Sequence, residues 1–420
     1  MSSIQALTAR EILDSRGTPT LEVTAVLADG TVATAGVPSG ASTGKHEALE
    51  LRDGDRHRYN GLGVLNAVAN VNGQLSEAVQ GMEATNQRSI DQRFLDVDGT
   101  VNKSKMGANA IVGASLAVAR AAATRAGLQL FQHLQQTFDL PTSPILPVPL
   151  ANLFNGGRHA STNLDLQEIW VVPRGISSTA EQVRAATEIN AKLKGILIRR
   201  NLDTDVGDEG GFSPRVQTTH QAFEMVSEAV DEAGYSLGEE VVLGVDAAAS
   251  SFFHDGHYRL AVEDKSLSRE ELSDFYANLV QRYMIRLLED PLEEDDWDGW
   301  QALRAHAGMV GVTIIGDDLF TTNQERLAEG IRRQAANGII IKPNQIGTIT
   351  EAIDTAKLAK ANNYTVVASH RSGETNDHWI VDLAVAIGAT YIKVGAPVRG
   401  ERVAKYNRLL QIAQAASNRG

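Results

Sequence analysis

Six short apolar runs in the C-terminal two-thirds of the chain each end on an ionisable residue. Consecutive endpoints are 23 to 43 residues apart, about the length of one strand, one helix and two loops. In a β/α barrel the C-terminal ends of the strands meet around one mouth, where catalytic groups collect. This spacing predicts such a barrel with the six endpoints at its mouth. The runs are VVLGVD ending at Asp246, IRLLE at Glu289, VTIIGD at Asp317, GIIIK at Lys342, TVVASH at His370 and ATYIK at Lys393.

Length and composition limit the class of protein. A chain of 420 residues is too long for one ordinary core and suits a barrel with one smaller domain. It contains no cysteine, which excludes thiolate metal sites and leaves oxygen and imidazole ligands. The formal net charge of -13 argues against a nucleic-acid partner. An anionic substrate would therefore need locally concentrated positive charge.

Charged residues interrupt every segment that could enter a membrane. Arg10 and Glu11 lie within the N-terminal stretch, so we expect no signal peptide. Arg120 divides the longest apolar candidate, so we expect no membrane span. The expected location is the cytoplasm.

The chain divides near residues 135 to 145, where LPTSPILPVP carries four prolines and cannot be helical. We expect an N-terminal α+β domain over 1–135 and the barrel over 145–420. In the first domain, Asp29-Gly30 between two strand-like runs predicts a type I′ hairpin. An Ala-rich stretch from Gly107 to Arg125 predicts a buried helix.

Beyond the proline-rich segment, strand-like and helical segments alternate, which predicts parallel strands. Ser268 followed by Glu271 predicts a capping box at the start of one helix, and Asn323 predicts the N-cap of another.

Three of the strand endpoints, Asp246, Glu289 and Asp317, are acids that follow apolar runs. Any one of them alone is more simply a loop acid or a helix cap. Together, and without cysteine, they indicate a site for Mg²⁺, which prefers carboxylate oxygens. Mn²⁺ could substitute.

Two further endpoints, Lys342 and Lys393, are lysines. A single lysine at a strand end is usually a solvated tether. Burial and nearby cations would push an ammonium toward its neutral form, able to take a proton. A lysine that stays charged can bind a carboxylate.

Glycine-rich and hydroxyl-rich segments supply further candidates. GDEGGFSP, residues 207–214, presents Asp208 and Glu209 among three glycines and predicts an active-site loop, with a simple tight turn as the alternative. PSGASTG, residues 38–44, could be a lid over a phosphate, or merely a flexible loop.

Two more segments carry a histidine. SHRSGET, residues 369–375, places Arg371 and Ser372 beside His370, which suits a phosphate clamp. NGGRHA, residues 155–160, brings His159, although a lone histidine in a loop is more often incidental.

Taken in order, these segments resemble the enolase family over essentially the whole chain. The resemblance rests on AREILDSRG, PSGASTG, GANAIVG, NGGRHA, LQE, GDEGGF, EDP, GDDLF, NQIG, SHRSGET, GAP and AKYN. It implies an enolase-type barrel whose early strands depart from the parallel pattern, with the N-terminal domain as its cap. It also implies elimination of water from 2-phosphoglycerate to give phosphoenolpyruvate, in a homodimer or octamer.

The resemblance also implies a role for each candidate residue and two Mg²⁺ ions per site. Lys342 is the implied base and Glu209 the implied acid, with Glu168 and Asp208 supporting it. The implied ligands of the first Mg²⁺ are Asp246, Glu289 and Asp317, and Ser42 holds the second with the phosphate. The residues implied to bind the phosphorylated carboxylate substrate are His159, Gln167, His370, Arg371, Ser372 and Lys393.

Several residues near the implied site differ from those usual in the family, among them Arg158, Pro343, Val394 and Gly400. Such changes can shift a ligand or admit a different substituent. Two alternatives therefore stay open. One is a specialised paralogue similar to the carboxyphosphonoenolpyruvate synthase of phosphonate biosynthesis, and the other is a non-catalytic protein on the same scaffold.

Overall fold

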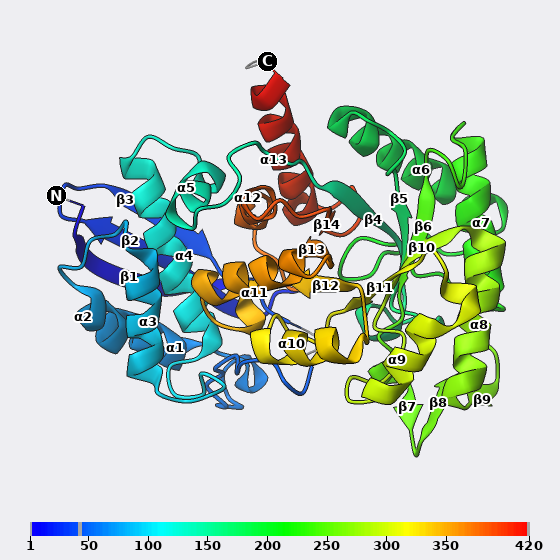
Figure 1. The fold of residues 1–420 in the computed structure, drawn as a ribbon, viewed down its shortest axis with the longest axis horizontal. Helices are drawn as coiled ribbons and strands as arrows, with labels where there is room; N and C mark the ends of the chain where they lie inside the picture. The colour runs from blue at the N-terminus through cyan, green and yellow to red at the C-terminus, as the bar shows by residue number, and fades with distance from the viewer. Residues whose placement is uncertain (1, 41–43, 418–420) are drawn as a thin grey trace.

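The computed structural model describes residues 2–40 and 44–417. Its N-terminal part is an antiparallel sheet in the order β1-β2-β3, covered on one side by helices (Figure 1). Alternate residues of β2 are buried, as expected for a sheet with one face on a core. The strands are β1 (Ile4–Leu13), β2 (Pro19–Leu27) and β3 (Val32–Gly36), and the helices are α1 (Leu65–Asn70), α2 (Ser76–Val79), α3 (Gln87–Asp98), α4 (Ala108–Arg125) and α5 (Leu130–Thr137).

Helix α4 is the core of this domain, as its alanine-rich sequence predicts. Fifteen of its 18 residues are buried, because the helix packs against β2 and β3 on one side and α3 and α5 on others. Small side chains allow this close approach. The approach is closest at Gly113, where even a Cβ atom would stand only 2.6 Å from a methyl carbon of Val23.

The turn between β2 and β3 differs from the predicted type I′ hairpin. Gly30 has φ +87°, but Asp29 does not take a positive φ, which a type I′ turn requires at both central residues. Leu27 accepts from Gly30 N at 2.9 Å and donates to Thr31 O at 2.9 Å. The loop is therefore a three-residue connection with glycine in the left-handed position. Dipeptide composition alone does not distinguish the two loop lengths.

The rest of the chain forms a closed eight-stranded barrel, in the order β10-β11-β12-β13-β14-β4-β5-β6. All six predicted apolar runs are strands of it. The strands are β4 (Val148–Asn155), β5 (Glu168–Val172), β6 (Val242–Asp246), β10 (Ile285–Glu289), β11 (Thr313–Gly316), β12 (Gly338–Ile341), β13 (Thr365–Ser369) and β14 (Tyr391–Lys393).

The barrel departs from the parallel pattern at β5, which is antiparallel to both β4 and β6. No α-helix separates β4 from β5, so the chain returns directly beside itself, as in a hairpin. The other described strand pairs of the barrel are parallel. This confirms both the parallel strands predicted from alternation and the early departure that the resemblance implies.

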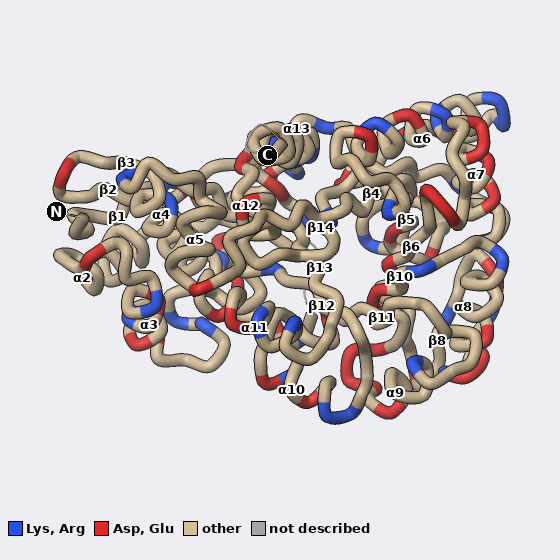
Figure 2. The backbone as a smooth tube through the Cα atoms, turned by 45° about the horizontal axis from the view of Figure 1, so that its top comes forward, with Lys and Arg blue, Asp and Glu red and all other residues tan. Residues whose placement is uncertain are grey.

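Helices surround the barrel, and a small sheet extends from one end (Figure 1). The Ser268 capping box and the Asn323 cap are present as predicted. In Figure 2, basic and acidic segments are interspersed over these helices and form no basic stripe in that view. The helices are α6 (Thr179–Arg199), α7 (Thr219–Glu232), α8 (Arg269–Tyr283), α9 (Trp297–Ala305), α10 (Gln324–Arg333), α11 (Ile349–Ala361), α12 (Trp379–Ala386) and α13 (Gly400–Ser417), and the sheet is β7 (Phe253–His254), β8 (His257–Leu260) and β9 (Lys265–Leu267).

The N-terminal domain meets the barrel at the C-terminal ends of the strands. Ser39 and Gly373 exchange two backbone hydrogen bonds, of 2.7 and 2.9 Å, and Ala48 N donates to Gln345 O at 2.8 Å. The segment after β3 therefore reaches the barrel mouth. No single helix in the described ranges is both long and apolar enough to cross a bilayer.

Candidate active site

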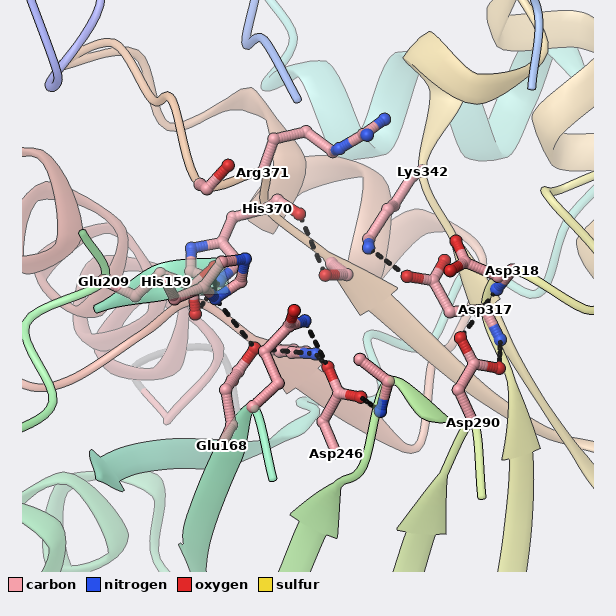
Figure 3. Close-up of a pocket in the computed structure, with 15 residues that line it drawn as sticks. His159, Glu168, Glu209, Asp246, Asp290, Asp317, Asp318, Lys342, His370 and Arg371 are labelled. Carbon is pink, nitrogen blue, oxygen red and sulfur yellow. Dashed lines mark hydrogen bonds and ion pairs between the residues drawn. The ribbon is translucent and has the colours of Figure 1, made fainter. Parts of the chain in front are cut away.

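One cavity at the barrel mouth collects most of the predicted site residues (Figure 3). They come from β5, from the ends of β6 and β11 to β14, and from the loops after β4 and α6. The predicted residues lining it are His159, Gln167, Glu168, Glu209, Asp246, Asp317, Lys342, His370, Arg371, Ser372 and Lys393; Ala248, Asp290, Asp318 and Ser369 complete the wall.

Three predicted residues are not placed in the wall. Glu289 is buried beneath it and contacts Lys393. Asp208 does not line the cavity; its backbone N donates to His159 O at 3.0 Å, which ties its loop to the loop after β4. Ser42 lies outside the described residues.

Lys393 is surrounded by carboxylates. Its Nζ lies 2.9 Å from Asp246 Oδ2, 2.9 Å from Glu289 Oε1 and 3.0 Å from Glu168 Oε1. The ammonium also stands 4.9 Å from the ring centroid of Trp170. Burial alone would lower the pKa of Lys393, but the acids, Asp246 foremost, raise it well above its usual value. Lys393 therefore stays charged, which fits the predicted role of binding an anion.

Lys342 is paired with Asp317 in a short contact between Nζ and Oδ2. The prediction that burial and neighbouring cations make this lysine neutral is wrong for this structure. Burial does act to lower the pKa of Lys342, but the adjoining Asp317 charge outweighs it and raises the pKa. The carboxylate and the ammonium come from neighbouring strand ends, a proximity that endpoint spacing does not reveal.

On the other side of the cavity, Glu168, Glu209 and His159 form a buried group (Figure 3). Nδ1 of His159 lies 3.7 Å from Glu168 Oε1 and 3.5 Å from Glu209 Oε1. Burial, and then the charge of Glu209, raise the pKa of Glu168 well above its ordinary value. Burial lowers the pKa of His159, which keeps the ring neutral. Burial would also raise the pKa of Glu209, but His370 and His159 lower it well below its ordinary value, so the proton of the pair rests on Glu168.

The glycines of the 207–214 loop bring Glu209 into this group. A Cβ at Gly207 would stand 2.6 Å from His159 O, and Gly210 has φ +88°. Gly207 N donates to Gly211 O at 2.9 Å, which closes the loop. Glu209 is 2% exposed as a result. The loop is therefore not a simple surface turn, because it carries Glu209 into the cavity wall; its role in an active site stays a prediction.

The predicted phosphate clamp is paired with an acid from the N-terminal domain. Nη1 of Arg371 lies 2.9 Å from Glu47 Oε2, and Nη2 lies 3.1 Å from Glu47 Oε1. Nη1 of Arg16 reaches Ser372 Oγ at 3.4 Å. Arg371 and Ser372 therefore line the cavity with Arg16 next to Ser372, an arrangement suited to a phosphate.

Two groups of three ligand-bearing side chains, among the residues described, have ligand atoms within 4.8 Å of one another. One is His159, Glu168 and Glu209, and the other is Asp290, Asp317 and Asp318. The predicted set of Asp246, Glu289 and Asp317 is not one of them, because Lys393 stands between Asp246 and Glu289.

The site nevertheless suits a divalent cation. Oε2 of Glu289 is buried without a hydrogen-bond partner among the described residues, although a buried carboxylate oxygen normally has one. Burial raises the pKa of Glu289, and Asp246 raises it further. A donor set of carboxylates with unmet charge fits Mg²⁺.

Sequence reasoning missed Glu47, Asp290, Asp318 and Gln345. Asp290 accepts from the backbone N of Asp317 at 2.9 Å and of Asp318 at 2.8 Å, so it fixes the turn that carries both acids. Gln345 Nε2 donates to Asp317 Oδ1 at 2.9 Å. The doubled acids in EDP and GDD were the available signal for Asp290 and Asp318.

The residues that depart from the usual family pattern fit their local surroundings. Pro343 is the first residue of a 3₁₀ turn, where a missing N–H costs nothing. A Cβ at Gly400 would meet no heavy atom within 4 Å. Val394 is buried, and Arg158 is exposed beside a second cavity that shares Ala248 and Asp318 with the first.

Comparison with known proteins agrees with this geometry. A family model described as the enolase N-terminal domain matches residues 4–134, and one described as the enolase C-terminal TIM barrel domain matches residues 143–420. A curated protein of Rubrobacter xylanophilus, named enolase, is 53% identical over 415 residues, which cover 99% of this chain and 95% of that protein.

Proposed function

This chain belongs to the enolase family, and on that premise we propose that it removes water from 2-phosphoglycerate to give phosphoenolpyruvate. The observation that carries the proposal is the division of one cavity between two kinds of proton-transfer group. Lys342 lies on one side, and the Glu168–Glu209 pair lies on the other (Figure 3). Elimination of water is aided by a base that takes the α-proton and an acid that protonates the departing hydroxyl group.

The first chemical step would be removal of the proton α to the substrate carboxylate. This proton is weakly acidic, because its loss places a second negative charge on an anionic group. Lys342 is the proposed base, and the charged Lys393 binds the carboxylate. A lysine base with Mg²⁺ is the established pattern of the enolase superfamily.

The second step would be departure of the hydroxyl group as water. Glu168 holds the proton of the buried pair, because its pKa is raised, and Glu209 is the proposed group that passes this proton to the leaving oxygen. Arg371, Ser372 and Arg16 hold the phosphate, so the reacting carbons stay between base and acid.

Metal binding is proposed at the acids of the same cavity. Asp246, Glu289 and Asp317 would hold one Mg²⁺, and Ser42 with the phosphate would hold a second. When bound, Mg²⁺ would offset the negative charge of these acids, so Asp317 would no longer raise the pKa of Lys342 as strongly. The ion would also stabilise negative charge on the substrate carboxylate.

Neither alternative function is favoured. The 53% identical relative is named enolase, and the departures at Pro343 and Gly400 displace nothing near the cavity. A non-catalytic role would leave the paired acids and the two buried lysines without an explanation. We also propose the domain limits 1–135 and 145–420. We further propose a homodimeric or octameric assembly, and light scattering would test it by measuring the molar mass.

The deciding experiment is the ultraviolet absorbance rise of enolpyruvate formation, measured with saturating Mg²⁺ and 2-phosphoglycerate. We expect turnover of roughly 1 to 1000 per second, the ordinary enzyme range. A flat trace from folded protein that binds Mg²⁺ would remove the proposal. Binding of 2-phosphoglycerate without turnover would then favour the specialised paralogue.

A further inference from the structure

Arg402, on α13, is a wholly buried arginine that belongs to none of the roles above. Its guanidinium lies beneath the two loops that carry Glu209 and His370. It donates to Arg371 O at 2.8 Å, to Ser372 O at 2.6 Å and to Asp208 O at 3.2 Å. One side chain of the C-terminal helix thus joins the proposed acid loop to the proposed phosphate clamp.

A fourth contact of Arg402 is with the ring of His370. Nη1 lies 2.6 Å from Nδ1, within hydrogen-bond distance. A guanidinium has five donors, no acceptor and no proton that it can lose in a protein. Nδ1 must therefore be the acceptor, and a neutral ring carries its only proton on Nε2.

The protonated nitrogen faces the proposed acid. Nε2 of His370 lies 3.4 Å from Glu209 Oε2 and makes no hydrogen bond of good geometry to any described residue. The ring lines the cavity. With the opposite tautomer, Nε2 would turn a lone pair toward the carboxylate. The proton position therefore decides whether His370 supports Glu209 or repels it.

The charges around His370 also keep the ring neutral. The charged groups facing it are Glu209, Arg402 and Lys393. Burial is the largest influence and, with Arg402 and Lys393, lowers the pKa of His370 to about 3, although Glu209 opposes them. The ring is then uncharged throughout the physiological range.

We propose that Arg402 is a positioning residue that holds the ring proton of His370 on Nε2 and so aims an N–H group at Glu209. This inference builds on the proposed function only where activity is measured. The tautomer itself follows from the donor chemistry of Arg402 and can be observed in the absence of substrate.

The first test is nitrogen NMR of the full-length protein labelled with [¹⁵N]histidine, with His370→Gln used to assign the signal. We expect Nδ1 of His370 to show the shift of an unprotonated ring nitrogen, and Nε2 that of a protonated one, unchanged from pH 5 to pH 8. The reverse pattern, or titration of the ring in this range, would overturn the proposal whether or not the protein converts 2-phosphoglycerate.

The second test is Arg402→Met, which removes the donors. We expect Nδ1 of His370 to lose its donor, so that the ring proton is no longer confined to Nε2, and the pKa of His370 to rise only in part, because burial remains. The turnover number should fall roughly 10- to 100-fold, with a smaller change in KM and a new loss of activity as pH falls through that pKa. A folded variant that keeps the wild-type tautomer and pH profile would overturn the positioning role.

Arg399→Met is the matched control. Arg399 lies near the same helix end and contacts Gly207 O at 3.5 Å and Ser15 O at 3.3 Å, but not His370. It should retain the wild-type NMR pattern and pH profile. If Arg402→Met does not fold, Arg402→Lys provides the test. A single ammonium cannot make all four contacts of the guanidinium, so we expect the pH profile of activity to shift partway. An unchanged pH profile would contradict the proposal.

Discussion

Nζ of Lys393 lies 2.9 Å from Oε1 of Glu289, and both side chains are buried. The same ammonium contacts two more buried acids, so one cation serves three carboxyl groups. The pairing makes Lys393 structural as well as functional, because a buried charge without its partner is costly.

Lys393→Met should therefore destabilise the protein. Removing one partner of a buried charge pair typically costs about 3–5 kcal/mol, and three acids lose their cation here. Chemical denaturation at neutral pH measures the change. Lys45→Met is the control, since Lys45 pairs with Glu293 through a side chain that is 62% exposed, and it should cost less than about 1 kcal/mol. Equal losses in both variants would contradict the buried network.

Proton exchange separates the proposed base from the proposed acid. Lys342→Ala should stop exchange of the substrate α-proton with deuterated solvent. Glu209→Gln should leave part of this exchange while blocking elimination, since the two residues act in different steps. NMR of 2-phosphoglycerate in deuterium oxide gives the rates. Equal loss in both variants would show that the roles are assigned wrongly.

Magnesium affinity should depend on Asp317 and on the residue that orients it. Asp317→Asn removes a charge, and Gln345→Leu removes the donor to Oδ1. Changes of a partner that orients a ligand typically weaken metal binding about 10- to 100-fold, and we expect Asp317→Asn to weaken it by roughly 10-fold or more. Calorimetric titration with Mg²⁺ tests this without turnover. Unchanged affinity in the Asp317 variant would place the metal elsewhere.

Asp91 should make stability depend on pH. It lies on α3, is 1% exposed and accepts from Thr350 N at 3.0 Å across the domain junction. Burial raises the pKa of Asp91 from 3.8 to about 6. The folded state therefore binds a proton that the unfolded state has lost, and stability falls as pH rises from about 4 to 6.

The Asp91→Asn variant removes this dependence. Relative to the wild type, it should gain stability between pH 4 and pH 7, by at most about 3 kcal/mol for a shift of this size. Denaturation at both pH values measures the difference. A difference that stays constant with pH would contradict the raised pKa.

The unusual residues Pro343 and Gly400 should have little effect on catalysis. Pro343→Val adds an N–H where none is needed, and Gly400→Ser adds a side chain into open space. The double variant should keep kcat within about 10-fold of the wild-type value, because no contact in the cavity changes. This is a small difference compared with the range of kcat among enzymes. A large rise in dehydration would instead indicate a pocket adapted to another substrate.

Local patterns were sufficient for much of the fold. The apolar runs that end at Asp246 and Lys393 are barrel strands because continuous apolar sequence suits strands buried on both faces. The Ser268 and Asn323 caps could also be predicted from the sequence, because each cap depends only on residues within one helical turn. The glycines around Glu209 were also informative, because the chain there approaches His159 too closely for a side chain.

Contacts between segments far apart in the chain could not be predicted from the sequence. The pairing of Lys342 with Asp317 reversed the pKa shift expected for Lys342. No local sequence pattern predicts that Arg402 contacts His370. The turn at Gly30 depended on how the two strands aligned, which dipeptide composition does not specify.

The sequence by itself determined the barrel, the identity of its strand ends and the resemblance to the enolase family, because these depend on periodicity and on motifs within short segments. Only the tertiary structure decided which acid neutralises which lysine, and where the proton of His370 lies. These properties depend on distances of about 3 Å between side chains far apart in the chain, where the strength of a charge contact changes steeply with separation and burial.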